Sequence, residues 1–317
     1  MKRTATSIVG ATVRRGPHSG RARESSVRRW GSRQAWLFVA PLLIVNVLVI
    51  TGPGLASVFY SFTEWDGIGV PKFVGLQNYQ ELFSSPNVLN AIVHNLWWTA
   101  FFLVVPMTMG LVGAFVLSRL KRGQILFRVL YFIPYVLATV VSAAIWKQIL
   151  DPKGGVVATL SQWGIPGLDG INFLGNPDLA LGSVAVINNW QWWGFLLVIF
   201  LAAMQAVNPS LYEAAQLDGA NPFQEFWHVT LPAIRPTLMF LGLMTIVWSF
   251  LVFDYVFLLT QGGPAGSTDV LSTLLYRSAF SEQRAGYASA VAMLLVVISA
   301  SVVLGYIFLR RRLKWDI

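Results

Sequence analysis

The sequence contains no cysteine and only three histidines. Without cysteine there is no disulfide scaffold, thiol nucleophile or Cys-ligated metal. The three histidines, His18, His94 and His228, stand outside the apolar stretches, so these stretches lack the residues of most nucleophile–base pairs. No group of residues has the spacing of metal ligands. A G-x-x-x-x-G-K-[ST] phosphate loop is also absent. The sequence therefore predicts neither an enzyme nor a metal site, and any ATP site must belong to a partner.

Charged residues are also scarce. They make up 12% of the chain, where a soluble domain has about 25%, and 55% of the residues are hydrophobic. The apolar residues gather in stretches of about 20, the length at which a helix crosses a hydrocarbon core of about 30 Å. These features predict an integral membrane protein. The net charge of +9 is a poor sign of nucleic-acid binding, because the basic residues stand between and beside the apolar stretches.

Six stretches are expected to cross the membrane, each with boundaries accurate to a few residues: Trp36–Tyr60, Leu96–Leu117, Val129–Ile149, Leu181–Met204, Leu238–Leu259 and Ser289–Leu309. Lys and Arg indicate their orientation, because cytoplasmic segments are enriched in both. With the N-terminus inside, the inner segments hold 18 of the 23 Lys and Arg residues: 1–35, 118–128, 205–237 and 310–317. Both termini are therefore predicted to be cytoplasmic.

The predicted organisation is a basic tail followed by one membrane domain. Residues 1–35 are rich in Arg, Ser and Gly and show no apolar period, so we expect a disordered cytoplasmic tail. Residues 36–317 would form a single six-span transmembrane domain. The first apolar stretch is too long for a cleaved signal peptide. No internal repeat is visible, which counts modestly against a secondary transporter.

The inner loop at 205–237 contains strong helix-capping signals. Asn208 is a good N-cap with Pro209 behind it, and Gly219 supplies a left-handed residue that ends the first helix. Asn221 and Gln224 then form a capping box for a second helix, expected to end near Thr230 because Pro232 and Pro236 follow. The loop therefore predicts two short helices on the cytoplasmic surface.

One face of the first helix is suited to contact. Leu211, Ala214, Ala215 and Asp218 share this face, and the two alanines would let another backbone approach closely. Two interpretations follow from the residues alone. The pair of helices is either a knob that fits a groove on a partner or an ordinary amphipathic hairpin at the interface.

The same loop resembles a known family. Glu213-Ala214-Ala215, Gly219 and Leu231-Pro232 keep the spacing of the EAA loop of permeases from binding-protein-dependent ABC importers, with Val229 where the signature has Ile. The resemblance covers about residues 36–312. Further segments resemble the MalF/UgpA-like carbohydrate permeases: Asp218-Gly219-Ala220, Phe73–Tyr79, Phe253-Asp254, Leu259-Thr260 and Gly262-Gly263-Pro264.

This resemblance implies an all-α protein of the MetI/MalF-like fold, with six transmembrane helices and a cytoplasmic EAA coupling helix. It implies a bacterial inner-membrane importer with a second permease subunit, two cytoplasmic ATPases that bind ATP and Mg, and an external solute-binding protein. By position, the ATPase-coupling residues would be Leu211, Glu213, Ala214, Ala215, Asp218, Gly219, Leu231 and Pro232. Glu213 and Asp218 would meet polar or basic groups of the ATPase.

Polar residues inside the spans are candidates for a substrate path. Asn188, Asn189, Gln191 and Trp192 cluster in the fourth span, where amides suit sugar hydroxyls and aromatic faces suit sugar rings. The alternative is packing between helices. Asp254 and Tyr255 in the outer part of the fifth span are the second group, with Asp254 either near the substrate or paired with a cation of the partner permease.

The predicted cargo is a sugar, with glycerol phosphodiesters or other polyols as the alternative and a secondary transporter as the runner-up class. The outer loops at 61–95, 150–180 and 261–287 are long for simple turns. We expect short helices there that dock the binding protein.

Overall fold

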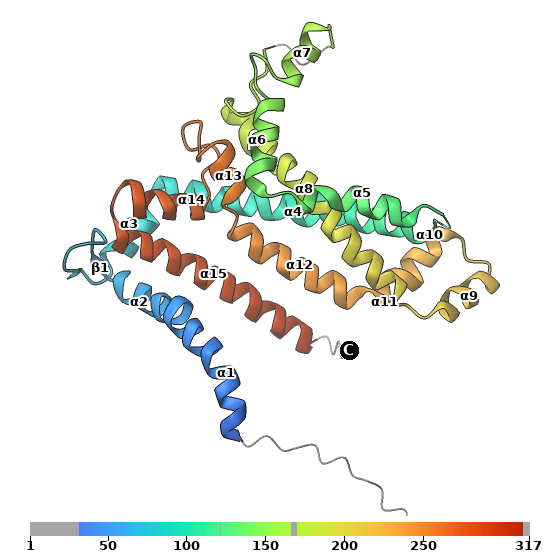
Figure 1. Cartoon of the computed structure of the whole chain (residues 1–317), viewed down its shortest axis with the longest axis horizontal. Coiled ribbons are helices and arrows are strands. Elements are labelled where there is room, and N and C mark those ends of the chain that lie inside the picture. Colours follow the sequence, from blue (N-terminus) through green and yellow to red (C-terminus); the bar gives the residue numbers. More distant parts are fainter. Residues whose placement is uncertain (1–31, 121, 166–169, 313–317) are drawn as a thin grey trace, which may run out of the picture. The chain divides into compact units, whose positions relative to one another are not determined.

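The computed structural model describes residues 32–120, 122–165 and 170–312, most of them in helices (Figure 1). The chain forms two compact units, with the boundary between Pro53 and Gly54. The first unit contains α1 (Ser32–Asn46) and the π-helical turn η1 (Val47–Thr51), and α2 (Gly52–Tyr60) runs across the boundary. Helix α1 begins four residues before the predicted first span, and the rest of the predicted tail lies outside the described residues.

The second unit holds a small antiparallel hairpin of β1 (Thr63–Glu64) and β2 (Lys72–Phe73), in which Thr63 pairs with Phe73. Its helices are α3 (Gln77–Ser84), α4 (Pro86–Ser118), α5 (Gln124–Val136), α6 (Thr139–Ile149), α7 (Val156–Gln162), α8 (Pro177–Gln205), α9 (Pro209–Leu217), α10 (Pro222–Glu225), α11 (Leu231–Ala233), α12 (Arg235–Phe250), α13 (Asp254–Leu259), α14 (Leu271–Tyr276) and α15 (Ala285–Arg312). Two π-helical turns interrupt them, η2 (Phe226–Thr230) and η3 (Arg277–Ser281). The expected short helices are therefore present in the three outer loops.

Helix α8 is the centre of the packing, lying against both α4 and α5. Close approach depends on glycine. A Cβ on Gly110 of α4 would stand 2.8 Å from the Leu196 Cβ, and a Cβ on Gly194 of α8 would stand 1.9 Å from the Tyr131 carbonyl oxygen of α5. Small residues allow membrane helices to pack backbone to backbone.

Length and composition allow four helical stretches among the described residues to cross a membrane: Trp36–Tyr60, α4, α8 and α15. Two bent pairs raise this number to six if each is one crossing. These are α5 with α6, bent by 93°, and Pro222–Ala233 with α12, bent by 71°.

The third predicted span, Val129–Ile149, is not one straight helix, because α5 and α6 meet at a bend of 93°. Leu137 has an extended conformation between α5 and α6 (φ −66°, ψ 137°), and its carbonyl accepts a hydrogen bond from Gln191 Nε2 at 2.7 Å. The break is therefore stabilised by a side chain of α8, distant in sequence. Non-helical backbone at membrane depth is tolerated where it is buried in protein or lines a cavity.

The fifth span also differs from the prediction. Instead of one helix over Leu238–Leu259, α12 ends at Phe250 and α13 begins at Asp254. At the inner end, helical structure continues through Pro232, and the chain changes direction at Ile234. Pro236 occupies the first turn of α12, where a missing N–H costs nothing. Pro232 directly follows the π-helical turn η2 and did not end the second loop helix at Thr230.

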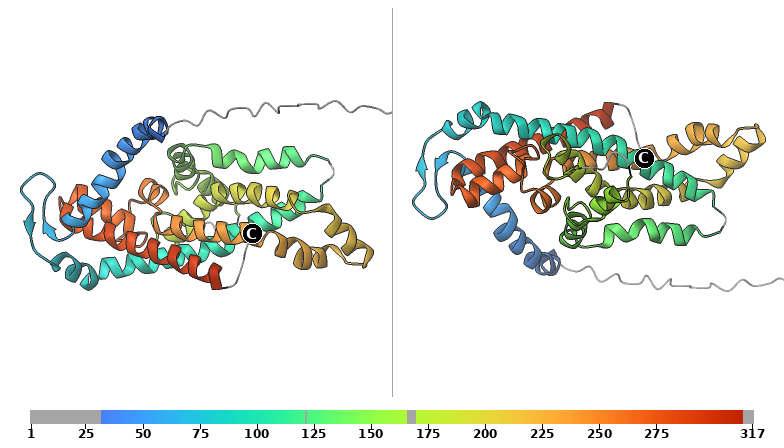
Figure 2. Two further views of the ribbon diagram at one scale, coloured as in Figure 1. Left: turned by 90° about the horizontal axis from the view of Figure 1, so that it is seen from below. Right: turned by 90° about the horizontal axis from the view of Figure 1, so that it is seen from above.

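Helices α9 and α10 lie at one end of the second unit, and the β1–β2 hairpin with α3 lies at the opposite end (Figures 1 and 2). The long helices α4, α8 and α15 run between these ends.

Candidate functional site

Helix α9 has the two ends that its sequence predicts. Asn208 Oδ1 accepts a hydrogen bond from the Ser210 N–H at 3.0 Å. At the other end Gly219 has φ +79°, its N–H donates to the Gln216 carbonyl, and the Ala220 N–H donates to the Ala215 carbonyl at 2.9 Å. This is the hydrogen-bond pattern of a Schellman motif, which requires a left-handed residue. The predicted helix start and stop are confirmed.

The second helix of the loop begins with the predicted capping box. Asn221 Oδ1 accepts from the Phe223 and Gln224 N–H groups, each at 3.0 Å, and Gln224 Oε1 accepts from the Asn221 N–H at 2.8 Å. Because both helices are capped by their own residues, a tight turn of fixed geometry joins them.

The α9 surface is largely free within this chain. Leu211 is 49% exposed, and Glu213, Ala214, Asp218 and Gly219 are exposed as well. In the described part of the chain, neither the Glu213 nor the Asp218 carboxylate has an ion pair or a side-chain hydrogen bond.

The opposite side of α9 holds the helix to the rest of the loop. Ala215 is half-buried, and the Tyr212 hydroxyl lies 3.1 Å from Thr230 Oγ1. Leu231 is half-buried and Pro232 is exposed. The predicted coupling residues therefore divide into an outward face on α9, Ala215 on the packed side of that helix, and Leu231 and Pro232 in α11.

An ion pair that the sequence did not predict ties this loop to α4. The Arg119 guanidinium, just after α4, bonds the carboxylate of Glu225, whose side chain is only 5% exposed. The same guanidinium lies 4.5 Å from the centre of the Phe115 ring, and Phe115 packs against Phe226 at 4.7 Å. Since Arg119 and Glu225 are far apart in sequence, no local pattern links them.

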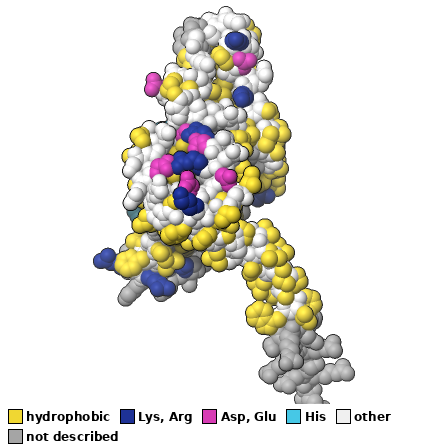
Figure 3. Space-filling model, turned by 90° about the vertical axis from the view of Figure 1, so that its left-hand side faces the viewer, with side chains coloured by type: hydrophobic (Ala, Val, Ile, Leu, Met, Phe, Trp, Pro, Cys, Tyr) yellow, Lys and Arg dark blue, Asp and Glu magenta, His cyan; other side chains and the backbone are white. Residues whose placement is uncertain are grey.

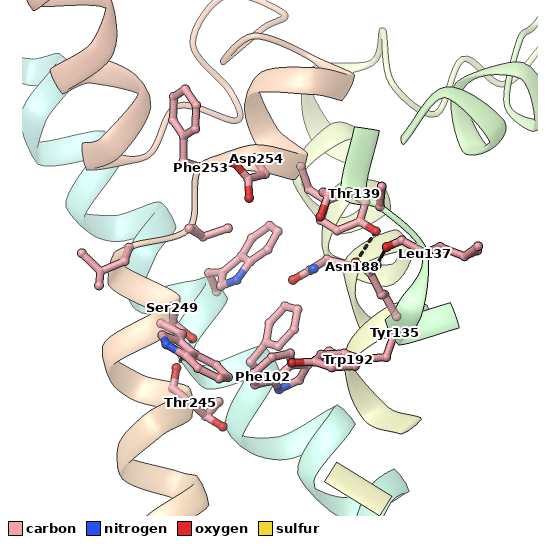
Figure 4. A pocket seen from close by; sticks show the side chains of 17 residues that line it. Phe102, Tyr135, Leu137, Thr139, Asn188, Trp192, Thr245, Ser249, Phe253 and Asp254 are labelled. Atoms are coloured by element: carbon pink, nitrogen blue, oxygen red, sulfur yellow. Dashed lines mark hydrogen bonds between the residues drawn. The ribbon is translucent and has the colours of Figure 1, made fainter. Parts of the chain in front are cut away.

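A cavity of about 430 Å³ lies where the two broken helices meet α8 and α4 (Figure 4). Its volume is in the usual range for small-molecule sites. Its 17 lining residues come from several elements far apart in the chain: Trp98, Phe102, Tyr135, Leu137, Ala138, Thr139, Asn188, Gln191, Trp192, Thr245, Trp248, Ser249, Leu251, Val252, Phe253, Asp254 and Tyr255.

The cavity brings together the two groups of residues predicted for a substrate path. Asn188, Gln191 and Trp192 line it from α8, and Asp254 and Tyr255 line it from α13. Asn189 does not line it: this side chain is 7% exposed and its Nδ2 points to Met109 Sδ at 3.4 Å. Successive helical residues point about 100° apart, so only some of a polar run can face one cavity.

Sequence reasoning missed most of the aromatic and hydroxyl lining. Trp98, Phe102, Tyr135, Thr245 and Trp248 come from helices in which no polar cluster marks them. Trp248 stands edge-on to Trp192 with the ring centres 4.4 Å apart. The signal that exists is compositional, since tryptophan inside a predicted span is unusual away from the interfaces.

The polar groups of the cavity fall into two kinds. The Tyr255 hydroxyl bonds Gln191 Oε1 at 2.7 Å and Ser142 Oγ at 2.9 Å, and Gln191 Nε2 in turn bonds the Leu137 carbonyl, so these side chains stabilise the wall. By contrast, Trp192 Nε1 and Thr245 Oγ1 are buried without a hydrogen-bond partner among the described residues.

The end of the second unit that holds the β1–β2 hairpin and α3 carries both acidic and basic side chains (Figure 3). Arg284 bonds both oxygens of Glu81, at 2.7 and 2.5 Å, and Lys72 lies 3.8 Å from Glu64. The backbone N–H groups of Gly69 and Ile68 bond the exposed Asp66 carboxylate and lower its pKa.

The loop with Gly262-Gly263-Pro264 is well ordered by contacts. Asp269 is 5% exposed, accepts from Arg277 at 2.8 Å and from Thr273 Oγ1 at 3.1 Å, and its backbone carbonyl lies 2.7 Å from His94 Nδ1. Across the described residues no three His, Asp or Glu side chains are placed to hold a metal ion.

Known proteins resemble the chain over nearly its whole length. It is 34% identical to the probable ABC transporter permease protein YurN of Bacillus subtilis, over 83% of this chain and 91% of that protein. It is 33% identical to the multiple sugar-binding transport system permease protein MsmF of Streptococcus mutans, over 85% and 91%.

Solved structures show the same fold. A crystal structure of a bacterial ABC transporter involved in the import of the acidic polysaccharide alginate contains a chain that is 27% identical, with a TM-score of 0.78 over 88% of this chain and 96% of that one. A crystal structure of a bacterial alginate ABC transporter in complex with its alginate pentasaccharide-bound periplasmic protein also contains a chain that is 27% identical. Its TM-score is 0.78, over 90% of this chain and 97% of that one.

A family model matches residues 106–315, about two thirds of the chain. The chain therefore belongs to the family of binding-protein-dependent transport system inner membrane components, which are transport permeases and not enzymes.

Proposed function

We propose that this chain is the membrane-spanning subunit of an ATP-driven importer that moves a sugar delivered by an external solute-binding protein. Its partners would be a second permease subunit and two cytoplasmic ATPases that bind ATP and Mg. The observation that carries this proposal is the capped α9 helix, which stands exposed at one end of the unit with two carboxylates that no described residue pairs.

The proposed coupling residues are those of the exposed α9 face and the α11 segment. Leu211, Ala214 and Asp218 would enter a cleft on the ATPase, and Gly219 would fix the turn. Through Arg119 and Glu225, movement of the loop would reach α4, which packs along α8. The loop is thus connected to the helices that line the cavity.

A sugar is the proposed cargo because the cavity combines aromatic faces with amide and hydroxyl groups. Aromatic rings offer apolar faces for sugar rings, and amides bond hydroxyls. The names of relatives support it, since MsmF belongs to a sugar-binding transport system and the solved transporter imports alginate. Asn188, Gln191, Trp192, Asp254 and Tyr255 would form part of the path, with polyols or glycerol phosphodiesters as the alternative cargo.

Six crossings and cytoplasmic termini belong to the same proposal. The two bent helix pairs would each count as one crossing, which gives the six spans. Residues 1–35 would be a cytoplasmic tail and residues 36–317 the permease domain in the bacterial inner membrane, with α9 inside and the β1–β2 hairpin outside.

Co-purification from the native membrane in mild detergent tests the proposal. An ATPase subunit and a second permease should accompany the chain, and ATP hydrolysis by the complex should rise when sugar-loaded binding protein is added. A chain that never carries an ATPase subunit, in cells whose uptake persists after ATP depletion, would be a secondary transporter instead.

A further inference from the structure

The cavity has an unusual charge inventory for a site with so many polar groups. Asp254 is the one residue with a formal charge among its 17 lining residues, all of which the structure describes, and no Lys or Arg reaches it. The next two basic residues after Asp254 in the sequence are engaged elsewhere, Arg277 with Asp269 and Arg284 with Glu81. The part of the site that this chain contributes is therefore negative.

The Asp254 carboxylate has no structural task in this chain. It is the first residue of α13, yet the start of that helix has no side-chain capping bond. Asp254 is exposed and forms neither an ion pair nor a side-chain hydrogen bond within the described residues. Figure 4 shows its carboxylate directed into the space that Asn188 faces from the other side. Its neighbour Tyr255, by contrast, is bonded to the wall.

We infer that Asp254 makes this cavity a charge filter, which admits neutral and amino sugars and excludes sugars that carry carboxylate or phosphate groups. The inference rests on the proposed function and specifies its substrate class. It disfavours glycerol phosphodiesters and acidic sugars, the class to which the alginate imported by the solved relative belongs.

Electrostatics gives the filter its strength. Two like charges several ångströms apart in a partly water-filled protein site repel by about 1–2 kcal/mol, which is on the order of tenfold in occupancy. Repulsion of the wrong ligand is an efficient source of specificity, since neutral hydroxyls lose nothing in the same place. Stacking on the aromatic walls would act equally on neutral and acidic sugars.

The absence of cysteine from the chain allows a direct measurement. Thr139 lines the cavity and is half-buried, so Thr139→Cys places a single thiol there. In the assembled importer, the cationic thiol reagent MTSET and the anionic MTSES would be compared for their rates of modification, relative to their rates with a free thiol. Asn188→Cys is a second reporter if the first variant assembles poorly, and the importer without either thiol gives the background.

The MTSET to MTSES rate ratio should exceed the free-thiol ratio by about tenfold, and Asp254→Asn should return it to the free-thiol value. Charges on the second subunit are present in both proteins, so the difference belongs to Asp254. A ratio at the free-thiol value in the parent, which becomes anion-preferring in Asp254→Asn, would mean that a partner cation neutralises Asp254, and it would overturn the filter. A ratio that Asp254→Asn leaves unchanged would overturn it as well.

Sugars of equal size then test the substrate class. Glucosamine and glucose should slow modification of Thr139→Cys by a neutral reagent, and glucuronate should protect several-fold less, a difference that Asp254→Asn removes. Glucuronate that protects as well as glucose contradicts the filter alone. If no sugar protects, the cavity is not a sugar site, which contradicts both this inference and the proposed cargo.

Discussion

Gly219 is the residue on which the geometry of the coupling loop depends. Its φ of +79° is left-handed, while a Cβ there would meet nothing within 4 Å. A side chain at this position is therefore strained by the backbone alone, at a cost of about 1–2 kcal/mol. Gly219→Val should unwind the end of α9 and reduce the amount of ATPase that co-purifies, while the protein still inserts.

Gly242→Ala is the matched control for that substitution. Gly242 lies in α12 with open space at its Cβ and no left-handed φ, so alanine should be neutral or stabilising there. Normal ATPase assembly in Gly219→Val would show that the turn has no part in docking.

Tyr255 is predicted to hold the cavity wall and not the cargo. Its hydroxyl bonds Gln191 and Ser142, which are 8% and 0% exposed. Tyr255→Phe should leave two buried polar groups unsatisfied and cost about 1–3 kcal/mol. The melting temperature of the purified complex measures this loss.

Tyr135→Phe, in the same cavity, gives the comparison for Tyr255→Phe. The Tyr135 hydroxyl has no hydrogen bond among those that the described residues form. Its loss should change the melting temperature less. Equal decreases in melting temperature for the two variants would contradict a structural role of the Tyr255 hydroxyl.

Helices whose ends are set by adjacent residues could be predicted, and helices shaped by distant contacts could not. Asn208, Gly219 and Asn221 act on backbone groups within five residues, so the loop helices followed from the sequence. The break at Leu137 depends on Gln191, and the Arg119–Glu225 pair joins residues 106 positions apart. A hydropathy run contains neither contact, so the sequence predicted the third span without its bend and did not predict the ion pair.

In the cavity, too, the sequence predicted what depends on local composition and not what depends on contacts between distant segments. The sequence pointed to Asn188, Gln191, Trp192, Asp254 and Tyr255, because polar groups in an apolar run are unusual. It could not tell that Asn188 faces the cavity and Asn189 faces Met109, since this depends on which helices surround α8. Apart from its tryptophans, the apolar wall of the cavity carries no local sequence signal.

The contact between α5 and α8 depends on the absence of a side chain at one position. A Cβ on Gly194 would stand 1.9 Å from the Tyr131 carbonyl oxygen, which is backbone and cannot rotate away. Gly194→Ala must separate the two helices and should cost about 1–3 kcal/mol or abolish assembly. Detergent stability and the yield of intact complex report the effect.

Gly182→Ala is the control, because it is the same substitution at a position with space for a Cβ. It lies in the same helix α8 with nothing within 4 Å of its Cβ. Alanine there should be tolerated and could favour the helix. If Gly194→Ala and Gly182→Ala are equally stable, the close approach of α5 to α8 is incorrect.

The link between the loop and α4 should transmit movement as well as stability. Glu225 is nearly buried and Arg119 is its partner, so Glu225→Gln should cost about 1–3 kcal/mol. Because the loop would then move without α4, ATP hydrolysis should persist while uptake falls. A double-mutant cycle with Arg119→Gln measures the coupling of the pair.

An exposed ion pair provides the comparison for that cycle. Lys72 and Glu64 lie 3.8 Å apart with side chains 78% and 73% exposed, and such pairs contribute less than about 1 kcal/mol. Glu64→Gln should leave both stability and uptake unchanged. A cycle energy for Arg119 and Glu225 as small as this one would argue against a mechanical link.

At the scale of the whole molecule, the proposal requires the two ends of the second unit to face opposite sides of the membrane. The β1–β2 hairpin and α9 lie at these opposite ends (Figures 1 and 2). The predicted inner segments carry most Lys and Arg, and at the hairpin end Arg284 and Lys72 are paired with acids. The ends can therefore be assigned by which of them a polar reagent reaches.

Single cysteines in the otherwise cysteine-free chain can test this assignment. Ile68, in the β1–β2 turn, is 89% exposed, and Leu217, at the end of α9, is 90% exposed, so access to a polar reagent should depend on the side of the membrane and not on burial. A membrane-impermeant maleimide should label Ile68→Cys in spheroplasts and reach Leu217→Cys only after permeabilisation. The unsubstituted chain, which has no thiol, gives the background. Labelling of Leu217→Cys in sealed spheroplasts, with Ile68→Cys protected, would reverse the orientation and place α9 where no cytoplasmic ATPase could contact it.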